Sequence, residues 1–188
     1  MPNWCNNNIT ISGPIETIKT LWEEAIQDAD DETGLLNAMH PMPRELHDTD
    51  ADGSEGLNWY NWRVENWGTK WEVSSEGLEF IDNGDGTAEI TGWFDSAWAP
   101  PIGAYENFAD MMDNCSIEAS YYEPGMDFAG FWSTENGDEY CEDLHDEYKL
   151  PEDQQSDLFK RLDEEFALSE QFEQWDEDEE EMVLDDEA

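Results

Sequence analysis

The stretch KWEVSSEGLEFIDNGDGTAEITGWFDSAW, residues 70–98, carries the clearest fold signal in the chain. Apolar and polar residues alternate on both sides of NGDG, Asn83 to Gly86, and alternation with a period of two is typical of a half-buried β-strand. Asn, Asp and Gly tolerate the positive φ angles that a tight hairpin turn requires. The stretch therefore predicts two strands, over residues 70–82 and 87–98, joined as a hairpin.

A strand and a helix are predicted on each side of this hairpin. Residues 9–11 alternate like a strand, and apolar residues recur at helical spacing over residues 15–26. Beyond the hairpin, APPIGAYENFADMMDN (99–114) predicts a helix and SIEASYYE (116–123) a strand. The order β-α-β-β-α-β is that of a ferredoxin-like, split βαβ α+β fold, with an antiparallel sheet and two packed helices.

The remaining segments add smaller elements to this plan. DFAGFWS and EYCED, within residues 127–143, predict a closing hairpin that extends the sheet, and WYNWRVENWG predicts a short helix that ends at Gly68. Residues 28–58 are acidic and rich in Gly and Asp, so we expect a long loop there.

The chain changes character near Leu150. It has 50 acidic and 7 basic residues, a formal charge of −43, and residues 135–188 alone hold 24 acids and 3 bases. Apolar residues still fall at helical intervals in this acidic part: Leu158, Leu162, Phe166, Phe172 and Trp175. We therefore predict a ferredoxin-like domain over residues 1–148. Residues 149–188 would add an acidic amphipathic helix, from about Glu152 to Trp175, that docks on the body, and then a disordered acidic tail.

The charge restricts the class of partner. Like charges repel, so direct binding to nucleic acid or to an anionic membrane surface is disfavoured, and a basic protein or bound cations are expected instead. Cys5, Cys115 and Cys141 form no CxxC pair, which argues against a disulfide framework or a zinc site. Three reduced thiols are typical of a cytoplasmic protein. The start of the sequence, MPNWCNNNIT, does not resemble a signal peptide, and no apolar run approaches the ~18 residues of a membrane span, so we expect a cytoplasmic protein.

Two acidic segments could supply ligands for a metal ion. DTDADG, residues 48–53, matches the opening of a calcium loop with Asp48, Asp50 and Asp52 as ligands, but Trp59 stands where a bidentate Glu is needed. DADDE, residues 28–32, would add further acidic ligands. Calcium is therefore kept as an alternative, and no other cofactor is expected.

No catalytic constellation is evident. The three histidines are His40, His47 and His145, and nothing in the sequence places a nucleophile or an orienting carboxylate beside them. Motifs such as GxSxG, HExxH and the P-loop are absent from the sequence, so we predict that the protein is not an enzyme.

The segment NWYNWRVENWGTKW, residues 58–71, places Arg63 and Lys70 among aromatic residues. Such a pattern is found where bases stack on aromatic rings beside cations. It is equally typical of a packed helix whose cations lie on its own rings. The net charge favours packing, so we predict that four tryptophans are mainly core residues: Trp59, Trp62, Trp67 and Trp71.

Five blocks carry a family resemblance: MPNWCNN, HPMPREL, WYNWRVENWGTKWE, FDSAWAPP and YYEPGMDFAG. In this order they resemble the YubB ferredoxin-like family of small phage and conjugative-plasmid proteins, over residues 1 to about 130. The resemblance implies the fold predicted above and an origin in a mobile genetic element. It implies no catalytic residue, and residues 135–188 lie outside it.

These observations lead to a functional hypothesis. Residues 152–187 contain 17 acids. If these residues formed a helix, the carboxylates would be spaced on average ~3 Å apart along its axis. The phosphates of one DNA strand have a similar spacing of ~3.4 Å. An acidic mobile-element protein with such an array could mimic DNA and inhibit a basic host defence protein of the restriction or CRISPR kind. The expected partner-binding residues are Glu152, Asp153, Asp157, Asp163, Glu164, Glu165, Glu170, Glu173, Asp176, Glu177, Asp178, Glu179, Glu180, Glu181, Asp185 and Asp186.

Two alternatives stay open. The first is a haloadapted acidic protein without mimicry, which would unfold at low salt. The second is a divalent-cation-binding module built from the acidic loops, which calorimetry with calcium, magnesium and manganese would detect. The sequence also leaves open whether the chain forms a homodimer.

Overall fold

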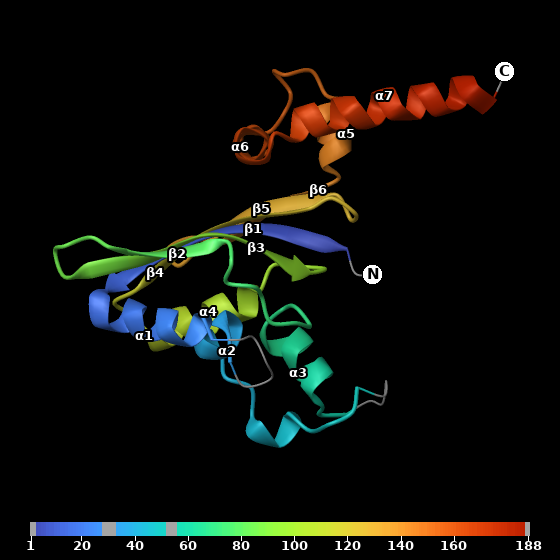
Figure 1. Ribbon diagram of the computed structural model, residues 1–188. Coiled ribbons are helices and arrows are strands. Elements are labelled where there is room, and N and C mark those ends of the chain that lie inside the picture. The colour runs from blue at the N-terminus through green and yellow to red at the C-terminus, as the bar shows by residue number, and fades with distance from the viewer. Residues whose placement is uncertain (1–2, 28–32, 52–55, 187–188) are drawn as a thin grey trace.

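A six-stranded antiparallel sheet forms the centre of the computed structural model (Figure 1), which describes residues 3–27, 33–51 and 56–186, with side chains up to Asp178. The strands lie in the order β2-β3-β1-β4-β5-β6. Their bounds are β1 Trp4–Pro14, β2 Leu78–Asp82, β3 Thr87–Ala97, β4 Ser116–Glu123, β5 Phe128–Ser133 and β6 Gly137–Glu142. The first four strands have the ferredoxin-like order, with β5 and β6 added at one edge, so the predicted fold class is confirmed.

The hairpin that indicated the fold is present as predicted. Asp82 pairs with Ala88, and the turn between them contains Gly84 and Gly86 at φ 76° and 95°. The strand before the turn is shorter than expected, because it begins at Leu78 and not at residue 70. The preceding residues are turned inward: the carboxylate of Glu72 accepts hydrogen bonds from the backbone N–H groups of Leu36 (2.7 Å) and Asn37 (2.9 Å).

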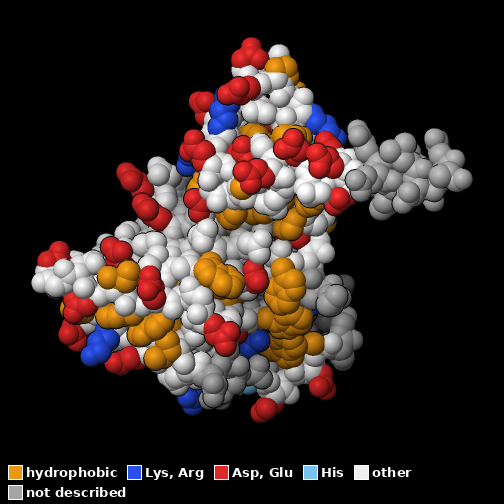
Figure 2. Space-filling view, turned by 45° about the horizontal axis from the view of Figure 1, so that its top comes forward, with side chains coloured by type: hydrophobic (Ala, Val, Ile, Leu, Met, Phe, Trp, Pro, Cys, Tyr) orange, Lys and Arg blue, Asp and Glu red, His pale blue; other side chains and the backbone are white. Residues whose placement is uncertain are grey.

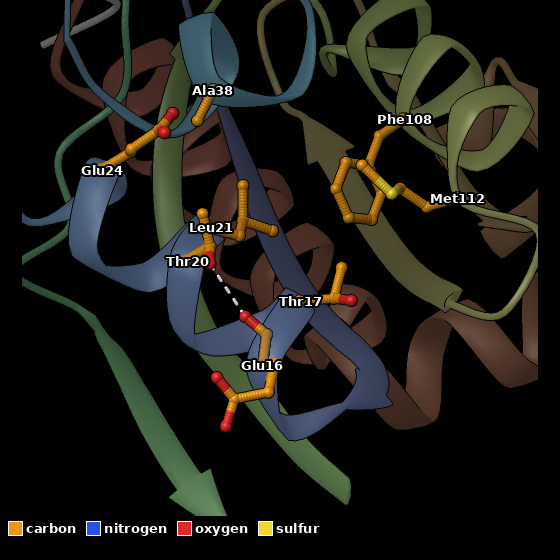
Figure 3. Close-up of a pocket in the computed structure, with 8 residues that line it drawn as sticks. All are labelled: Glu16, Thr17, Thr20, Leu21, Glu24, Ala38, Phe108 and Met112. Atoms are coloured by element: carbon orange, nitrogen blue, oxygen red, sulfur yellow. Dashed lines mark hydrogen bonds between the residues drawn. The ribbon is translucent and has the colours of Figure 1, made fainter.

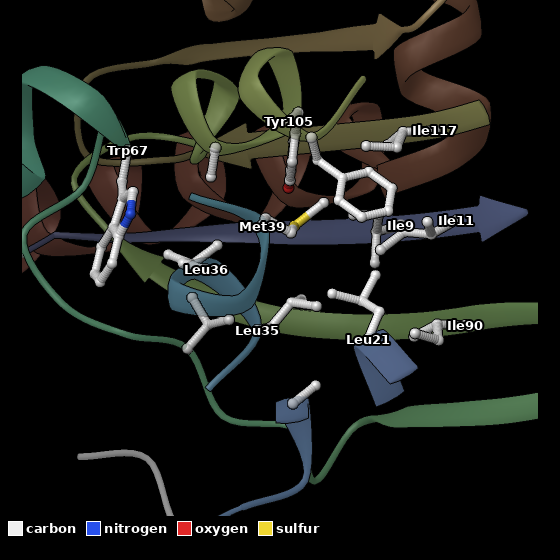
Figure 4. Packing of buried hydrophobic residues seen from close by; sticks show 14 of the residues in the cluster. Ile9, Ile11, Leu21, Leu35, Leu36, Met39, Trp67, Ile90, Tyr105 and Ile117 are labelled. Atoms are coloured by element: carbon white, nitrogen blue, oxygen red, sulfur yellow. The ribbon is translucent and has the colours of Figure 1, made fainter. Parts of the chain in front are cut away.

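One face of the sheet carries the main core (Figures 1 and 4). Helices α1 (Ile15–Ala25), α2 (Leu35–Met39) and α4 (Ile102–Met111) cover this face, and α3 (Trp59–Asn66) follows beside them. The strands contribute residues such as Ile9, Ile11, Ile90 and Ile117, and the helices contribute Leu21, Leu35, Leu36, Met39 and Tyr105.

The region expected to be a long loop is only partly irregular. Residues 28–32 and 52–55 lie outside the described part, but α2 and the 3-10 helix η1 (Arg44–Leu46) lie between them. The sequence signal for α2 was weak because the helix has only five residues. Its apolar residues are fixed by burial in the core.

The opposite face of the sheet is covered on one side by the C-terminal helices, α5 (Leu144–Tyr148), α6 (Asp157–Phe166) and α7 (Leu168–Asp186) (Figure 1). A second core cluster joins them to the sheet: Tyr122, Ala129, Leu144, Phe159, Leu162, Leu168 and Phe172. The prediction that this segment docks on the body is confirmed by this cluster.

The form of the C-terminal segment differs from the prediction in two respects. A single helix over Glu152–Trp175 was wrong, because Ala167 adopts a left-handed conformation (φ 51°) that separates α6 from α7. The carboxylate of Asp163 accepts hydrogen bonds from the backbone N–H and the hydroxyl of Ser169 (2.6 and 2.7 Å), which satisfies the start of α7. The tail that was expected to be disordered belongs to α7 up to Asp186.

Candidate interaction surface on the C-terminal helices

Helix α7 is the most acidic element of the fold. Its 19 residues, LSEQFEQWDEDEEEMVLDD, include ten acids and neither lysine nor arginine. Leu168 and Phe172 are fully buried, whereas Glu170, Glu173 and Glu177 are exposed. These three acids follow a helical spacing of three and four residues, so they form one stripe along the outside of the helix.

A cluster of rings holds α7 against α5. The ring of His145 lies 5.0 Å from that of Phe172 and 6.1 Å from that of Tyr148. Its Nε2 lies 3.0 Å from Oδ1 of Asp176. Trp175 packs edge-on to Phe172 at 5.4 Å. The first half of α7 is therefore held by ring packing and by the contact between His145 and Asp176. The acidic half of the helix begins directly after these contacts.

The structure divides the predicted partner-binding acids into three groups. Eight are exposed on the described surface: Glu152, Asp153, Asp157, Glu164, Glu170, Glu173, Glu177 and Asp178. Five occupy the last turns of α7, with side chains outside the described part: Glu179, Glu180, Glu181, Asp185 and Asp186. Three make contacts within the fold: Asp163, Glu165 and Asp176.

The three internal acids have structural partners that the sequence did not reveal. Asp163 caps α7, and Asp176 pairs with His145. Oε1 of Glu165 accepts hydrogen bonds from Nδ2 of Asn8 (2.9 Å) and from Oγ of Ser120 (3.0 Å), which fastens α6 to the sheet. A partner would compete with these contacts, so the available acidic surface consists of the eight exposed acids, four of which lie on α7.

Helix α6 is less acidic than its sequence surroundings suggest. It carries Lys160 and Arg161, and Nη1 of Arg161 lies 2.9 Å from Oε2 of Glu139. The guanidinium of Arg161 also lies 4.5 Å from the ring centroid of Phe131. Figure 2 shows the few basic side chains scattered among many acidic ones on the visible face. The uninterrupted negative charge is therefore a property of α7.

Only part of the predicted calcium loop lies among the described residues. Asp48 and Asp50 are exposed, and Asp52 lies outside the described residues, as does DADDE. Within residues 3–27, 33–51 and 56–178, no group of three or more His, Cys, Asp or Glu side chains could hold a metal ion. Because Asp52 lies outside the described residues, the calcium site stays a prediction.

Among the predicted core tryptophans, Trp62 and Trp67 are buried and Trp59 packs against the same cluster. The guanidinium of Arg63 lies 4.8 Å from the ring of Trp67, and Nε1 of Trp67 donates to the backbone oxygen of His40 (2.8 Å). Packing is confirmed for this group, in which the cation lies on the protein's own rings.

Trp71 differs from the other three, because it is 38% exposed. It lies in a surface cluster with Trp4 and Trp98, where the ammonium of Lys70 is 3.8 Å from the ring of Trp71 and 4.2 Å from that of Trp98. Trp98 has φ 75°, which is strained for an aromatic residue. The segments that meet here are far apart in the sequence, so no local pattern could have indicated the cluster.

A groove of about 380 Å³ lies between α1 and α4 (Figure 3). Leu21, Phe108 and Met112 form its apolar lining, and Glu16 and Glu24 lie at its rim. These two carboxylates are eight residues apart on α1, about 12 Å along the axis, which is too far for shared acid–base chemistry. The hydroxyl of Thr20 donates a hydrogen bond to the backbone oxygen of Glu16 (2.8 Å), so it is used within α1.

The three thiols are poorly suited to nucleophilic chemistry. Burial raises the pKa of Cys5 to about 12, and burial is also the main cause that raises the pKa of Cys115 and of Cys141. A raised pKa keeps a thiol protonated at neutral pH, whereas the thiolate is the reactive form. Across the described residues, the helices are too short or too polar to cross a membrane.

Comparison with known proteins identifies the family to which this fold belongs. No curated protein matches the chain. A solved structure, the protein Api92 from Yersinia pseudotuberculosis, aligns with a TM-score of 0.43 and 11% identity over 76% of this chain and 98% of that chain. The family described as the ferredoxin-like domain in Api92-like protein matches residues 66–185, which include the three C-terminal helices outside the resemblance noted above. The chain thus belongs to the family of Api92-like ferredoxin-like domains.

Proposed function

We propose that the chain is an acidic protein of phage or conjugative-plasmid type that mimics DNA and inhibits a host DNA-binding defence protein. The observation that supports this proposal most directly is α7, a helix with ten acids and no lysine or arginine, docked on a folded body. The proposed partner is a basic protein in the host cytoplasm, of the restriction or CRISPR kind. The proposed action is competition for its DNA-binding surface, without catalysis.

The spacing of charge on α7 is compatible with mimicry. A helix of 19 residues is about 28 Å long at ~1.5 Å per residue, so ten acids average one per ~3 Å of axis. One strand of DNA carries a phosphate per ~3.4 Å. A basic groove that neutralises phosphates with Lys and Arg would meet a similar line of negative charge.

The attachment of α7 favours a binding role over simple solubility. Helix α7 has acids at i,i+4 spacing at positions 176 and 180, and at 177 and 181, and like charges at this spacing destabilise a helix. The fold anchors the first half of the same helix by burying Leu168 and Phe172. A solvated tail needs no such anchor, whereas a cationic partner would remove the repulsion and stabilise the helix.

The test compares two four-charge variants of the full chain. The first changes Glu170, Glu173 and Glu177 to Gln and Asp178 to Asn. The control changes four exposed acids at the opposite face of the sheet: Glu23, Glu24, Glu106 and Asp110. Both variants lose the same charge, but only the first alters α7. Each immobilised variant is incubated with host lysate, and retained proteins are eluted with salt or with double-stranded DNA.

We expect the wild type and the control to retain a DNA-binding protein that duplex DNA releases, and the α7 variant to lose most of it. Salt should weaken the contact steeply, because the attraction is between exposed charges. Equal retention by both variants would contradict a role of α7. Unfolding of the wild type at low salt, with recovery in molar potassium chloride, would favour haloadaptation instead.

A further inference from the structure

The groove between α1 and α4 is lined by three helices (Figure 3). Its neutral side chains are Thr17, Thr20 and Leu21 from α1, Phe108 and Met112 from the end of α4, and Ala38 from α2. Figure 3 shows Leu21, Phe108 and Met112 directed into the same space. The volume of about 380 Å³ lies within the ~300–1,000 Å³ of typical ligand pockets. We call this hollow the α1–α4 groove.

The floor of the groove belongs to the main core. Leu21 and Phe108 are 5% and 3% exposed and are members of the main core cluster. Ala38 and Met112 are partly buried and pack against the same cluster. Both α1 and α4 pack more against the short helix α2 than against each other, so a hollow remains between them above the core. Removal of apolar surface from water is favourable, so the groove suits an apolar side chain that extends this core.

The rim of the groove is acidic. Glu16 and Glu24 line it, and both side chains are exposed. Lys19, the only basic residue of α1, pairs with Glu23 at 3.9 Å, and neither of these two residues lines the groove. Among the described residues that line the groove there is no lysine, arginine or histidine. A ligand with positive charge beside an apolar centre would therefore complement it.

The walls of the groove favour a helical ligand over an extended one. The backbone N–H and C=O groups inside an α-helix bond to one another, so walls made of helices offer few backbone groups to a ligand. An extended segment in the groove would leave its own backbone groups unpaired, which is costly. A helix satisfies its own backbone, and an amphipathic helix that lays its apolar face in an apolar groove is a recurring mode of recognition.

The spacing of the rim carboxylates defines where the ligand needs its cations. Glu16 and Glu24 are eight residues apart on α1, which is about 12 Å along the axis. Two lysine or arginine residues seven positions apart on a second helix lie on one side of it, ~10 Å apart. Their long side chains can therefore reach both carboxylates at once.

The charge opposes two occupants that the chain itself could supply. The run from Met182 to Leu184 is apolar, but six acids precede it and three follow it, so the acidic rim would repel it. A second copy of the chain that presented the same face would bring Glu16 and Glu24 against their own counterparts. The occupant that fits is therefore a different protein.

We propose that the α1–α4 groove binds a basic amphipathic helix of a partner protein. Large apolar side chains of this helix would fill the hollow above Leu21 and Phe108, and its lysine or arginine residues would pair with Glu16 and Glu24. The groove lies on the face of the sheet opposite α6 and α7 (Figure 1). The proposal therefore does not rest on DNA mimicry by α7.

The test titrates the full chain with a fluorescent, amidated alanine-based peptide of about 15 residues, near the length at which such helices form in water. The peptide carries two leucines at i,i+4 spacing on one face and two flanking lysines seven positions apart. One control peptide has glutamine for lysine, and another has alanine for leucine. Fluorescence anisotropy is measured at ~0.15 M ionic strength, where exposed charges more than ~8 Å apart are largely screened. We expect saturable binding of the first peptide and clearly weaker binding of both controls.

Variants of the chain locate the contact. Glu24→Gln should weaken binding of the first peptide about two- to fivefold, the range of an exposed ion pair. Glu23→Gln is the matched control, because it removes the neighbouring exposed acid, which does not line the groove. It should leave binding unchanged, as should the four-charge α7 variant described above. Thr20→Trp places an indole in the groove at an exposed position and should abolish binding.

The proposal is overturned if either control peptide binds as tightly as the first, if no peptide shows saturable binding, or if Thr20→Trp binds like the wild type. It is equally overturned if Glu23→Gln or the α7 variant weakens binding as much as Glu24→Gln does, because attraction to the general charge of the chain would then suffice. Thermal melts confirm the folding of each variant, and the comparison of Glu24→Gln with Glu23→Gln decides should Thr20→Trp unfold. None of these outcomes alters the competition with DNA proposed for α7.

Discussion

Nε2 of His145 lies 3.0 Å from Oδ1 of Asp176, and this contact joins α5 to the point of α7 where the acidic half begins. The two residues are 31 positions apart, and Figure 1 shows α7 continuing beyond α5 toward the C-terminus. The contact is partly exposed, with 25% and 40% of the two side chains accessible. It therefore positions α7 more than it stabilises the whole fold.

Asp176→Asn should loosen α7 with little loss of global stability. The amide keeps the size of the side chain but removes the charge that attracts His145. We expect faster hydrogen exchange over residues 173–178 and a change below about 1 kcal/mol in the free energy of unfolding. The control is Glu177→Gln, an exposed neighbour with the same loss of charge. Equal exchange in both variants would show that the ring packing alone holds the helix.

Trp67→Ala should lower the melting temperature sharply, because Trp67 is fully buried and bonded to the backbone of His40. Truncation of a buried aromatic residue costs ~3–5 kcal/mol. Trp71→Ala removes the same side chain from a 38% exposed position four residues away, so its cost should be clearly smaller. Urea denaturation of both variants gives the comparison, and similar costs would refute the assignment of Trp67 to the core.

Removal of α6 and α7 should destabilise the sheet domain. A chain ending at Lys149 would expose Tyr122, Ala129 and Leu144, which the structure buries against α6 and α7. We expect a lower melting temperature and binding of a dye that reports exposed apolar surface. A chain ending at Asp178 keeps every residue of the second cluster and serves as the control. Identical melting of the two chains would mean that the helices add nothing to the domain.

Glu72 should make stability depend on pH. Burial is the largest influence on its carboxyl group and raises the pKa from 4.5 to about 7 in the folded chain, against the hydrogen bonds from Leu36, Val73 and Asn37. A raised pKa means that the folded state binds the proton more tightly. The stability that Glu72 contributes is therefore complete below about pH 4.5 and is lost as the pH rises through 7.

This loss should be on the order of 3 kcal/mol, and it is separated from general charge repulsion by comparison with variants. Glu72→Gln cannot ionise, so its free energy of unfolding should fall less between pH 5 and 8 than that of the wild type. Glu76→Gln, an exposed acid four residues away, should keep the wild-type slope. Urea denaturation across this pH range measures the free energy of unfolding of the wild type and of both variants. If all three free energies change with pH in parallel, the raised pKa of Glu72 is contradicted.

Ala167→Gly should stabilise the protein slightly. Ala167 has φ 51° between α6 and α7, a conformation that costs an L-residue ~1–2 kcal/mol and glycine little. The greater backbone freedom of glycine in the unfolded chain offsets part of the gain, so we expect a net increase below about 1 kcal/mol. Ala167→Val should be destabilising. Urea denaturation compares the midpoints of the two variants, and a higher midpoint for Ala167→Val would contradict the left-handed conformation of residue 167.

The sequence by itself determined the local elements and the sheet plan. Strand alternation around Asn83–Gly86, helical periodicity in residues 15–26 and the order of the segments are local properties, and they suffice for a ferredoxin-like α+β fold. The docking of the acidic segment was also predictable, because Phe166, Phe172 and Trp175 recur at helical spacing within it. Net charge is additive along the chain, so the acidity of α7 could be read directly.

Only the tertiary structure decided which side chains act together. Asp163, Glu165 and Asp176 look like their acidic neighbours in the sequence, and their partners Ser169, Asn8, Ser120 and His145 became evident only from the packing of α6 and α7. The hollows beside Asn8, between the sheet and the end of α6, likewise depend on strand register and on where α6 ends. Contacts between residues far apart in sequence leave no periodic signal in one chain, because burial and pairing select them after the local elements have formed.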